Sequence, residues 1–349
     1  MHNFFIGIMS GTSADSLDGC IVSFENEFKL IETESVDFGK NYKKIYEECI
    51  KSGYKVISDS SKLLQIEKIL DEKSIELVEK LINKSGIEKK KISSIALSGQ
   101  TVFHTNKRSY QIGNAQEVAN ASSINVCSDF RNFNIKQGGM GAPLIPAFHK
   151  YLYAENDMNK VIFNIGGIAN GTYLKGEEIS LASDVGPGNC LIDFYASKYY
   201  GFPFDNRGEI ANQGVINEDL LIKLNESVKN MSYPRADDKN DYYNLVNDSI
   251  SNVAPENIMR TVTEFTALKI EEFCKYCDSP DQVIFHGGGT KNLFLMKIIQ
   301  SKIDTKIRTT DDEISSKFVE AAAFAYLAYK NQGIISVSYT HLRAHETSF

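Results

Sequence analysis

Short apolar runs alternate with polar, glycine-containing turns along most of the chain. Longer stretches place apolar residues at helical spacing, as in the segment near 61–84. The apolar runs predict strands at 4–8, 20–24, 28–38, 92–97, 124–127, 161–165 and 283–285. Helices are expected near 41–51, 61–84, 189–200, 209–226, 256–276, 291–302 and 315–330. Strands interleaved with helices indicate an α/β fold with a substantial parallel sheet.

One pattern occurs twice. Residues 4–24 read as strand, Gly/Ser/Thr turn and strand, and residues 161–175 repeat that order with the turn Gly-Gly-Ile-Ala-Asn-Gly-Thr. Turns of small polar residues expose backbone N–H groups and let phosphates approach closely. The repetition therefore suggests two related half-domains that face one another.

Composition narrows the class of protein. The 349 residues are 42% hydrophobic and 24% charged, and 38 Lys+Arg against 45 Asp+Glu give a net charge of −7. This balance is typical of a globular protein and provides no electrostatic footprint for nucleic acid. No apolar run approaches the roughly 18–20 residues of a membrane span, and the first residues lack a signal-peptide pattern. We expect a cytoplasmic protein.

Two further features limit the chemistry. Of six cysteines, only Cys274 and Cys277 have Cys-x-x-Cys spacing, and without a second pair they are expected to be reduced, partly buried thiols rather than a metal site. Residues 336–349, SVSYTHLRAHETSF, break from the preceding pattern. They read as translated vector or adapter sequence, or as a disordered native tail, and are excluded from fold and function arguments.

The first glycine turn carries hydroxyls and carboxylates at Thr12, Ser13, Asp15 and Asp18. Hydroxyls and backbone amides suit phosphate oxygens, and a carboxylate can hold Mg²⁺ directly or through water. The alternative is an ordinary hairpin with solvated polar residues. The turn has no Walker A ending and opens no Rossmann helix.

Two later glycine clusters are also ambiguous. Gly166-Gly167 and Gly287-Gly288-Gly289 each follow a predicted strand. They suit either close approach to a nucleotide or a tight turn between elements.

Asp184 precedes the rigid turn Gly186-Pro187-Gly188, which ends at a predicted helix start, Asn189. A carboxylate held in this way is a candidate general base. The alternative is an aspartate that caps the helix.

Arg131, Asp129, His104 and His149 are further polar residues that could bind a substrate or serve in packing. Arg131 offers a planar fork that can bind a carboxylate through two hydrogen bonds, or it can form a local salt bridge with Asp129. His104 and His149 each end an apolar stretch, which is more typical of a packing histidine.

Taken together, these motifs resemble the anhydro-N-acetylmuramic acid kinase family. The resemblance covers roughly residues 5–330, and its specificity comes from the order of the whole set. The matching stretches are IMSGTSADSLD at 8–18, SGQTVFH at 98–104, IGN at 112–114, SDFR at 128–131, GGMGAPLIPAFH at 138–149, NIGGIAN at 164–170, DVGPGN at 184–189, GGGTKN at 287–292 and EAAAFA at 320–325.

The resemblance implies a two-lobed actin-like, sugar-kinase ATPase fold with ribonuclease H-like duplicated lobes. The expected boundaries are 1–125 plus 305–335 for the first lobe and 126–304 for the second. It also implies ATP- and Mg²⁺-dependent conversion of 1,6-anhydro-N-acetylmuramic acid to N-acetylmuramic acid 6-phosphate in peptidoglycan recycling. The family suggests a homodimer.

The same resemblance implies a role for each candidate residue. Asp184 would be the general base, and Arg131, with Asp129 and His104, would bind the substrate. Asp15 would hold Mg²⁺, directly or through water. ATP and its phosphates would be bound by Gly11, Thr12, Ser13, Ala14, Asp15, Ser16, Leu17, Asp18, Gly166, Gly167, Gly287, Gly288 and Gly289.

The sequence departs from the family pattern in three places. Ser16 and Leu17 replace a more usual Gly and Ile or Val, and Val185 replaces Thr. Residues 233–240, YPRADDKN, stand where the family has Pro-Lys-Ser-Thr-Gly-Arg-Glu, which leaves the local sugar contacts open. The competing functions are a sugar kinase that phosphorylates a free hydroxyl without ring opening and a non-catalytic, ATP-dependent binding protein.

Overall fold

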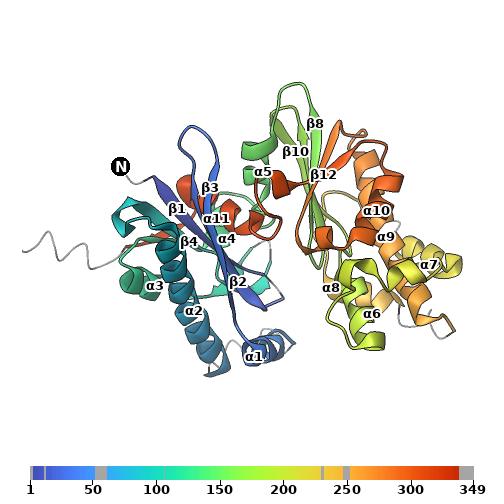
Figure 1. The fold of residues 1–349 in the computed structure, drawn as a ribbon, viewed down its shortest axis with the longest axis horizontal. Helices are drawn as coiled ribbons and strands as arrows, with labels where there is room; N and C mark the ends of the chain where they lie inside the picture. The colour runs from blue at the N-terminus through green and yellow to red at the C-terminus, as the bar shows by residue number, and fades with distance from the viewer. Residues whose placement is uncertain are drawn as a thin grey trace, which may run out of the picture. The chain divides into compact units, whose positions relative to one another are not determined.

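The computed structural model describes residues 3–11, 13–51, 61–105, 107–228, 232–246 and 252–337. The chain divides into two compact units (Figure 1). Unit 1 comprises residues 1–148 and 318–349, and unit 2 comprises residues 149–317. The first division falls inside helix α5 (Pro146–Tyr153).

Unit 1 is built on a six-stranded mixed sheet with strand order β13-β7-β4-β1-β2-β3. The strand β1 pairs with β2 in antiparallel register and with β4 in parallel register, so β1 and β4 form the centre of the sheet. The strands are β1 (Phe4–Ser10), β2 (Ser16–Ser23), β3 (Lys29–Asp37), β4 (Ile92–Leu97), β7 (Val126–Ser128) and β13 (Ile334–Ser336).

Helices cover both faces of this sheet (Figure 1). On one face, the buried stripe of α2 (Ser61–Ser85) packs on Ile6 and Ile8, which alternate with Gly7 along β1. On the other face lies α11 (Val319–Tyr329), so close that a Cβ on Gly7 would overlap the Ala321 carbonyl. The further helices of unit 1 are α1 (Lys40–Lys51), α3 (Ala115–Ser122) and α4 (Phe130–Lys136).

A small antiparallel hairpin follows β4 and carries several family motifs. It consists of β5 (Gln100–His104) and β6 (Ser109–Ile112). The phenolic hydroxyl of Tyr46 on α1 donates to the Thr101 carbonyl at 2.6 Å, which ties this hairpin to the helix that follows the first sheet strands.

Unit 2 contains a five-stranded mixed sheet with strand order β10-β9-β8-β11-β12. Its first hairpin, β8–β9, is antiparallel, and β8 pairs with β11 in parallel register. The strands are β8 (Asn159–Ile165), β9 (Ala169–Lys175), β10 (Glu178–Gly186), β11 (Gln282–His286) and β12 (Ile307–Thr309). The helices are α6 (Cys190–Tyr200), α7 (Glu218–Val228), α8 (Lys239–Val246), α9 (Pro255–Tyr276) and α10 (Leu293–Lys302).

The two faces of the second sheet differ in chemistry. Phe163 and Phe285 stack within a large apolar core that also contains residues of α6, α9 and α10. The opposite face holds a smaller cluster around Ile162 and Ile284. It also buries two histidines: His149 and His286 face each other with 2.9 Å between their Nε2 atoms, and His149 Nδ1 lies 2.9 Å from Thr172 Oγ1.

The predicted fold class is confirmed: each unit has an α/β arrangement whose sheet contains an antiparallel hairpin joined to parallel strands. The expected boundaries after 125 and 304 differ from the observed divisions, 148/149 and 317/318. The reason is strand pairing, because β7 joins the sheet of unit 1 through β4 and β12 joins the sheet of unit 2 through β11.

One expected helix is shorter than its hydrophobic pattern suggested. The segment 209–226 forms α7 only from Glu218, after 3₁₀ turns at Asn206–Gly208 and Ala211–Gln213. The Asp205 carboxylate accepts hydrogen bonds from the backbone N–H groups of Ile210 and Ala211, which stabilises this irregular path. In the part of the chain that the structure describes, no helix combines the length and hydropathy needed to cross a bilayer. All six cysteines are buried and form no disulfide.

Candidate active site

The turn between β1 and β2 holds the first group of candidate residues. Ala14 has a left-handed backbone (φ +51°), and its N–H donates to the Gly11 carbonyl at 3.1 Å. The side chains of Ala14 and Leu17 are buried in the core, so only their backbone atoms can meet a ligand. Ser13 is exposed, Gly11 and Ser16 are half-buried, and Thr12 lies outside the described residues.

Side chains of the Ser98-Gly99-Gln100 motif form hydrogen bonds with the backbone of this turn. The backbone N–H of Ser10 donates to Ser98 Oγ at 3.2 Å, and the Gln100 amide donates to the Gly11 carbonyl at 3.1 Å. The Ser10 hydroxyl also donates to Gln100 Oε1, and the Gln100 side chain is fully buried. The motif found in the sequence therefore anchors the backbone of the turn.

The two acids of the first turn have different surroundings. Asp15 is exposed and forms an ion pair with Lys43 of α1, with 2.7 Å between Oδ1 and Nζ. Asp18 lies within β2 and accepts a 2.7 Å hydrogen bond from the Ser35 hydroxyl of β3. Mg²⁺ prefers oxygen donors and usually takes only one or two protein carboxylates beside phosphate oxygens. The Asp15 carboxylate and the Ser13 hydroxyl are donors of that kind, so the turn fits the ion.

Arg131 and His104 are brought together at Gly141. Arg131 Nη1 donates to the Gly141 carbonyl at 3.0 Å, and an added Cβ on Gly141 would lie 3.0 Å from His104 Cε1. Burial lowers the pKa of Arg131, while the negative charge of Glu320 opposes that shift. Desolvation and the neighbouring Arg131 lower the pKa of His104. Arg131 therefore supplies the positive charge and the neutral His104 ring lies beside it, an arrangement suited to an anionic group.

Asp129 does not pair with Arg131 within the described residues. Its backbone is left-handed (φ +53°), and its carboxylate accepts a 2.6 Å hydrogen bond from the Asn132 amide. The local salt bridge considered as an alternative for Arg131 is therefore not formed. Asp129 stands at the N-cap of α4, the helix that carries Arg131, without a side-chain capping hydrogen bond.

The glycine clusters of unit 2 converge at the ends of β8 and β11. Asn189 N–H donates to the Gly166 carbonyl at 2.8 Å, and Cys190 N–H donates to the Gly167 carbonyl at 3.0 Å. Gly287 has φ +89°, and a Cβ there would overlap the Asn164 side chain.

The remaining two glycines of the triplet differ sharply. A Cβ on Gly289 would overlap the Ile165 side chain, whereas Gly288 has open space around the same position. Gly166, Gly167 and Gly287 to Gly289 are thus neighbours, as a shared nucleotide site requires.

Asp184 lies within β10, opposite Asn170 of β9, rather than at a helix start. The helix that follows is capped at Asn189 without a side-chain hydrogen bond, so the capping interpretation of Asp184 is wrong. Asp184 Oδ2 accepts a 2.8 Å hydrogen bond from the Asp237 backbone N–H. The pKa of Asp184 is raised to about 6, mainly by burial. The charge of Asp237 adds to this rise, whereas the Asp237 N–H and Arg235 oppose it. A carboxylate in this range can accept a proton near neutral pH.

The segment that surrounds Asp184 was not among the candidate residues. Asp184 N–H donates to the Arg235 carbonyl at 3.1 Å, and Arg235 N–H donates to Ser183 Oγ at 2.9 Å. Arg235 and Asp237 belong to the stretch 233–240 that departs from the family pattern, and this departure was the only sequence signal for them.

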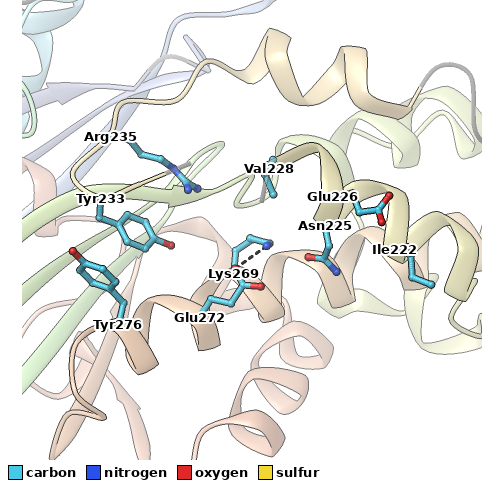
Figure 2. Close-up of a pocket in the computed structure, with 9 residues that line it drawn as sticks. All are labelled: Ile222, Asn225, Glu226, Val228, Tyr233, Arg235, Lys269, Glu272 and Tyr276. Atoms are coloured by element: carbon cyan, nitrogen blue, oxygen red, sulfur yellow. Dashed lines mark hydrogen bonds and ion pairs between the residues drawn. The ribbon is translucent and has the colours of Figure 1, made fainter. Parts of the chain in front are cut away.

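A pocket of about 480 Å³ adjoins this segment in unit 2 (Figure 2). The rings of Tyr233 and Tyr276 lie 5.0 Å apart, and Lys269 forms a 2.7 Å ion pair with Glu272. Arg235 contributes both to this pocket and to the surroundings of Asp184. The pocket is lined by Ile222, Asn225, Glu226, Val228, Tyr233, Arg235, Lys269, Glu272 and Tyr276.

Known proteins resemble this chain over almost its full length. The family model for anhydro-N-acetylmuramic acid kinase matches residues 3–338. The chain belongs to the anhydro-N-acetylmuramic acid kinase family. A relative of that name from Sulfurimonas denitrificans is 34% identical over 95% of this chain and 93% of its own length. Another from Vibrio vulnificus strain CMCP6 is 32% identical, covering 94% of this chain and 91% of its own length.

A solved structure supports the fold of this anhydro-N-acetylmuramic acid kinase family member. Component A of (R)-2-hydroxyglutaryl-CoA dehydratase from Acidaminococcus fermentans aligns with a TM-score of 0.51 and 9% identity. The alignment covers 95% of this chain and 99% of that one. At this identity the similarity concerns the fold alone.

Proposed function

We propose that the chain uses ATP to open and phosphorylate 1,6-anhydro-N-acetylmuramic acid, giving N-acetylmuramic acid 6-phosphate. Family membership supports the substrate and the kinase activity. The observation that carries the proposal is the environment of Asp184, a carboxylate with one oxygen held by a backbone N–H and a pKa of about 6.

The proposed reaction joins hydrolysis to phosphoryl transfer. Asp184 takes a proton from water as the water oxygen bonds to the anomeric carbon. The bond between that carbon and the anhydro bridge oxygen breaks, and the bridge oxygen bonds to the γ-phosphorus of ATP as ADP leaves. The proton on Asp184 is then released to solvent. Phosphoryl transfer itself requires mainly alignment and neutralisation of charge.

The glycine turns support the assignment of a nucleotide site. The backbone of Gly11–Asp18 in unit 1, and in unit 2 the glycines 166–167 and 287–289, would bind phosphate and adenosine through main-chain atoms. Asp15 would hold Mg²⁺, with the ion paired to phosphate oxygens. When bound, Mg²⁺ supplies charge neutralisation at the transferred phosphoryl group.

Arg131 is proposed to bind the lactyl carboxylate of the sugar. Its guanidinium sits beside His104, and α4 begins at Asp129, so all three assigned substrate residues belong to one local arrangement. Replacement Arg131→Lys retains the charge but loses the planar fork. It should therefore impair use of the muramic sugar far more than binding of ATP. An equal loss for both ligands would indicate a structural role.

The proposal extends to the setting of the protein. A recycling kinase for a cell-wall sugar acts in the cytoplasm, and the family suggests a homodimer. Analytical ultracentrifugation of the purified chain tests the dimer directly, and a single species at the monomer mass would reject it.

Product analysis in ¹⁸O-water tests the central reaction. With anhydro sugar and Mg-ATP, we expect one ¹⁸O at the anomeric hydroxyl and none in the phosphate ester. The matched control is unlabelled product kept in ¹⁸O-water without enzyme, which measures spontaneous anomeric exchange. A phosphorylated sugar that retains its anhydro ring, or faster turnover of open N-acetylmuramic acid, would favour a conventional sugar kinase. ATP binding without sugar-dependent turnover would favour a binding protein.

A further inference from the structure

The stretch 233–240, which departs from the family pattern, contacts β10 at several points around Asp184. Asp237 donates its backbone N–H to Asp184 Oδ2 at 2.8 Å. Arg235 accepts the Asp184 N–H at its carbonyl (3.1 Å) and donates from its guanidinium to the Val185 carbonyl. The segment is therefore bonded to the backbone on both sides of the Asp184 side chain and to that side chain itself.

The Asp237 carboxylate is itself held in place from two directions. Arg235 Nε lies 3.0 Å from Asp237 Oδ1, and the Tyr242 hydroxyl donates to Asp237 Oδ2 at 2.5 Å. The side chains of Arg235 and Asp237 are only 11% and 5% exposed. A buried ion pair of this kind is often no more stabilising than apolar residues of similar size. Stability alone does not account for it.

These contacts leave the two oxygens of Asp184 in different states. Oδ2 is occupied by the Asp237 N–H, whereas Oδ1 accepts no hydrogen bond from any of the described residues. The open oxygen is the one that can take a proton from water. Any rotation of the carboxylate is opposed by a donor whose own side chain is held by Arg235 and Tyr242.

We propose that Asp237 and Arg235 are positioning residues that orient the Asp184 carboxylate and set its charge state, the first by holding Oδ2 and the second by holding Asp237. This inference rests on the proposed function, in which Asp184 is the base. Neither residue touches the reacting atoms in this scheme. Their charges act on Asp184 with opposite signs.

The other described groups near Asp184 do not add a further unpaired charge that would act on its pKa. Asn170 of β9, directly across the ladder, is neutral. Lys269 of α9 packs against Gly186, two residues further along β10, and its charge is paired with Glu272. Asp237 and Arg235 are the charged groups that act on the pKa of Asp184, the first raising it and the second lowering it.

The test compares Asp237→Asn with Arg235→Gln. Asp237→Asn removes the negative charge but keeps the backbone N–H, so the acid limb of kcat/KM should move to lower pH by roughly one unit. Arg235→Gln should move the limb to higher pH by a similar amount. The control is Arg260→Gln, which breaks a partly buried pair with Glu264 in the same unit and should leave the limb unchanged.

A second readout needs no substrate. The Asp184 carboxyl carbon, ¹³C-labelled and assigned by its loss in Asp184→Asn, should titrate with shifts of opposite sign in the two variants of the free protein. If these shifts occur but no anhydro sugar is turned over, the positioning holds and the proposed function fails. If turnover is normal and the shifts are absent or share one sign, the positioning inference is overturned by itself.

Milder variants serve if either charge change prevents folding. Tyr242→Phe removes one hydrogen bond to a charged acceptor and should lower kcat by roughly tenfold with little change in KM. Arg235→Lys keeps the charge, so its acid limb should stay near that of the natural chain while kcat falls. An unchanged kcat in both variants would overturn the proposal.

Discussion

The turn after β1 and the turn after β8 begin from the same strand–turn–strand pattern, but they are supported by different means. In unit 1, the side chains of Ser98 and Gln100 hold the backbone of the turn. In unit 2, backbone carbonyls of Gly166 and Gly167 accept hydrogen bonds from the start of α6, and Gly287 and Gly289 pack closely against Asn164 and Ile165. The first turn is held mainly by polar side chains, and the second mainly by backbone hydrogen bonds and close packing at glycines.

The acids associated with the two regions follow the same division. Asp15 is exposed and paired with a lysine on a neighbouring helix, whereas the Asp184 carboxylate is half-buried and held by backbone. In the first region, a mutation should therefore be able to change activity without changing the stability of the protein. In the second region, many substitutions should affect both stability and activity.

The largest effect is expected from Asp184→Asn, which keeps the shape of the side chain but removes proton acceptance. General-base catalysis contributes about 10²–10⁴-fold, so kcat should fall at least that far. Steady-state kinetics with anhydro sugar and Mg-ATP measure the loss, and calorimetry should show retained ATP binding. Asp219→Asn, an exposed acid of the same unit, is the control. Near-normal turnover in Asp184→Asn would remove this residue from the mechanism.

Within unit 2, the glycine triplet allows stability and ligand contact to be tested by separate substitutions. Gly287→Ala combines a left-handed backbone with an overlap on Asn164, so it should destabilise the protein by about 1–3 kcal/mol. Gly288→Ala meets no atom within 4 Å and should melt like the natural chain.

Gly288→Ala is also the variant that isolates nucleotide contact. If ATP lies against this glycine, the added methyl group should weaken ATP binding without loss of stability, which isothermal titration would detect. Unchanged affinity would place the nucleotide away from Gly288. Equal melting temperatures for Gly287→Ala and Gly288→Ala would contradict the steric account of the turn.

A third effect concerns pH and the buried pair His149–His286. Burial lowers the pKa of His286 to about 3 and lowers that of His149 well below its usual value, so both rings are neutral in the folded chain. Unfolded histidines take up a proton below about pH 6.5. Stability should therefore decline as the pH falls from about 6.5 toward 3, by about 1 kcal/mol per histidine at pH 5.5.

Asp184 has the opposite effect on stability over part of this pH range, because it stabilises the folded chain as the pH falls. Its folded pKa of about 6 lies above the ordinary value of 3.8, so it contributes stability that is full below about 3.8 and is lost as the pH rises through 6. Melting curves at pH 7.5 and 5.5 should show a steeper acid loss in Asp184→Asn and a shallower one in His149→Gln/His286→Gln. A pH dependence unaffected by the histidine changes would refute the assignment.

The smallest effect on stability is expected in the first turn. Asp15→Asn breaks an exposed ion pair whose partners are 58% and 42% exposed, and such pairs contribute about 0–1 kcal/mol. The melting temperature should hardly change, while the Mg²⁺ concentration for half-maximal activity should rise if Asp15 holds the ion. Lys43→Met breaks the same pair but keeps the carboxylate, so its Mg²⁺ requirement should not rise. Equal rises in both variants would assign the effect to the ion pair.

Much of this picture could be predicted from the sequence because its signals are local. The duplicated hairpins, the Asp184 motif and the glycine clusters are each contained within a few residues, and their order identifies the family. The partner of Asp184 could not be found in the same way. It is a backbone N–H 53 residues away, and every residue other than proline carries such a group.

For the same reason, two further contacts could not be predicted from the sequence. The Ser98-Gly99-Gln100 motif was found, but its role in supporting the first turn depends on contacts across about 90 residues. His149 of α5 was expected to be a packing residue, and its partner His286 lies 137 residues away at the end of β11. Contacts between residues far apart in the chain depend on how the elements pack. A sequence motif therefore identifies one residue of such a contact but not its partner.

The position of β10 at the edge of its sheet has one further consequence. An uncovered edge strand presents free N–H and C=O groups to other chains and promotes aggregation. The stretch around Arg235 lies along this edge and takes up the Asp184 N–H. The residues that surround the candidate base thus occupy the backbone groups of this edge at Asp184 and Val185, where another strand could otherwise pair. We expect that shortening this stretch would reduce solubility, because it would expose these backbone groups.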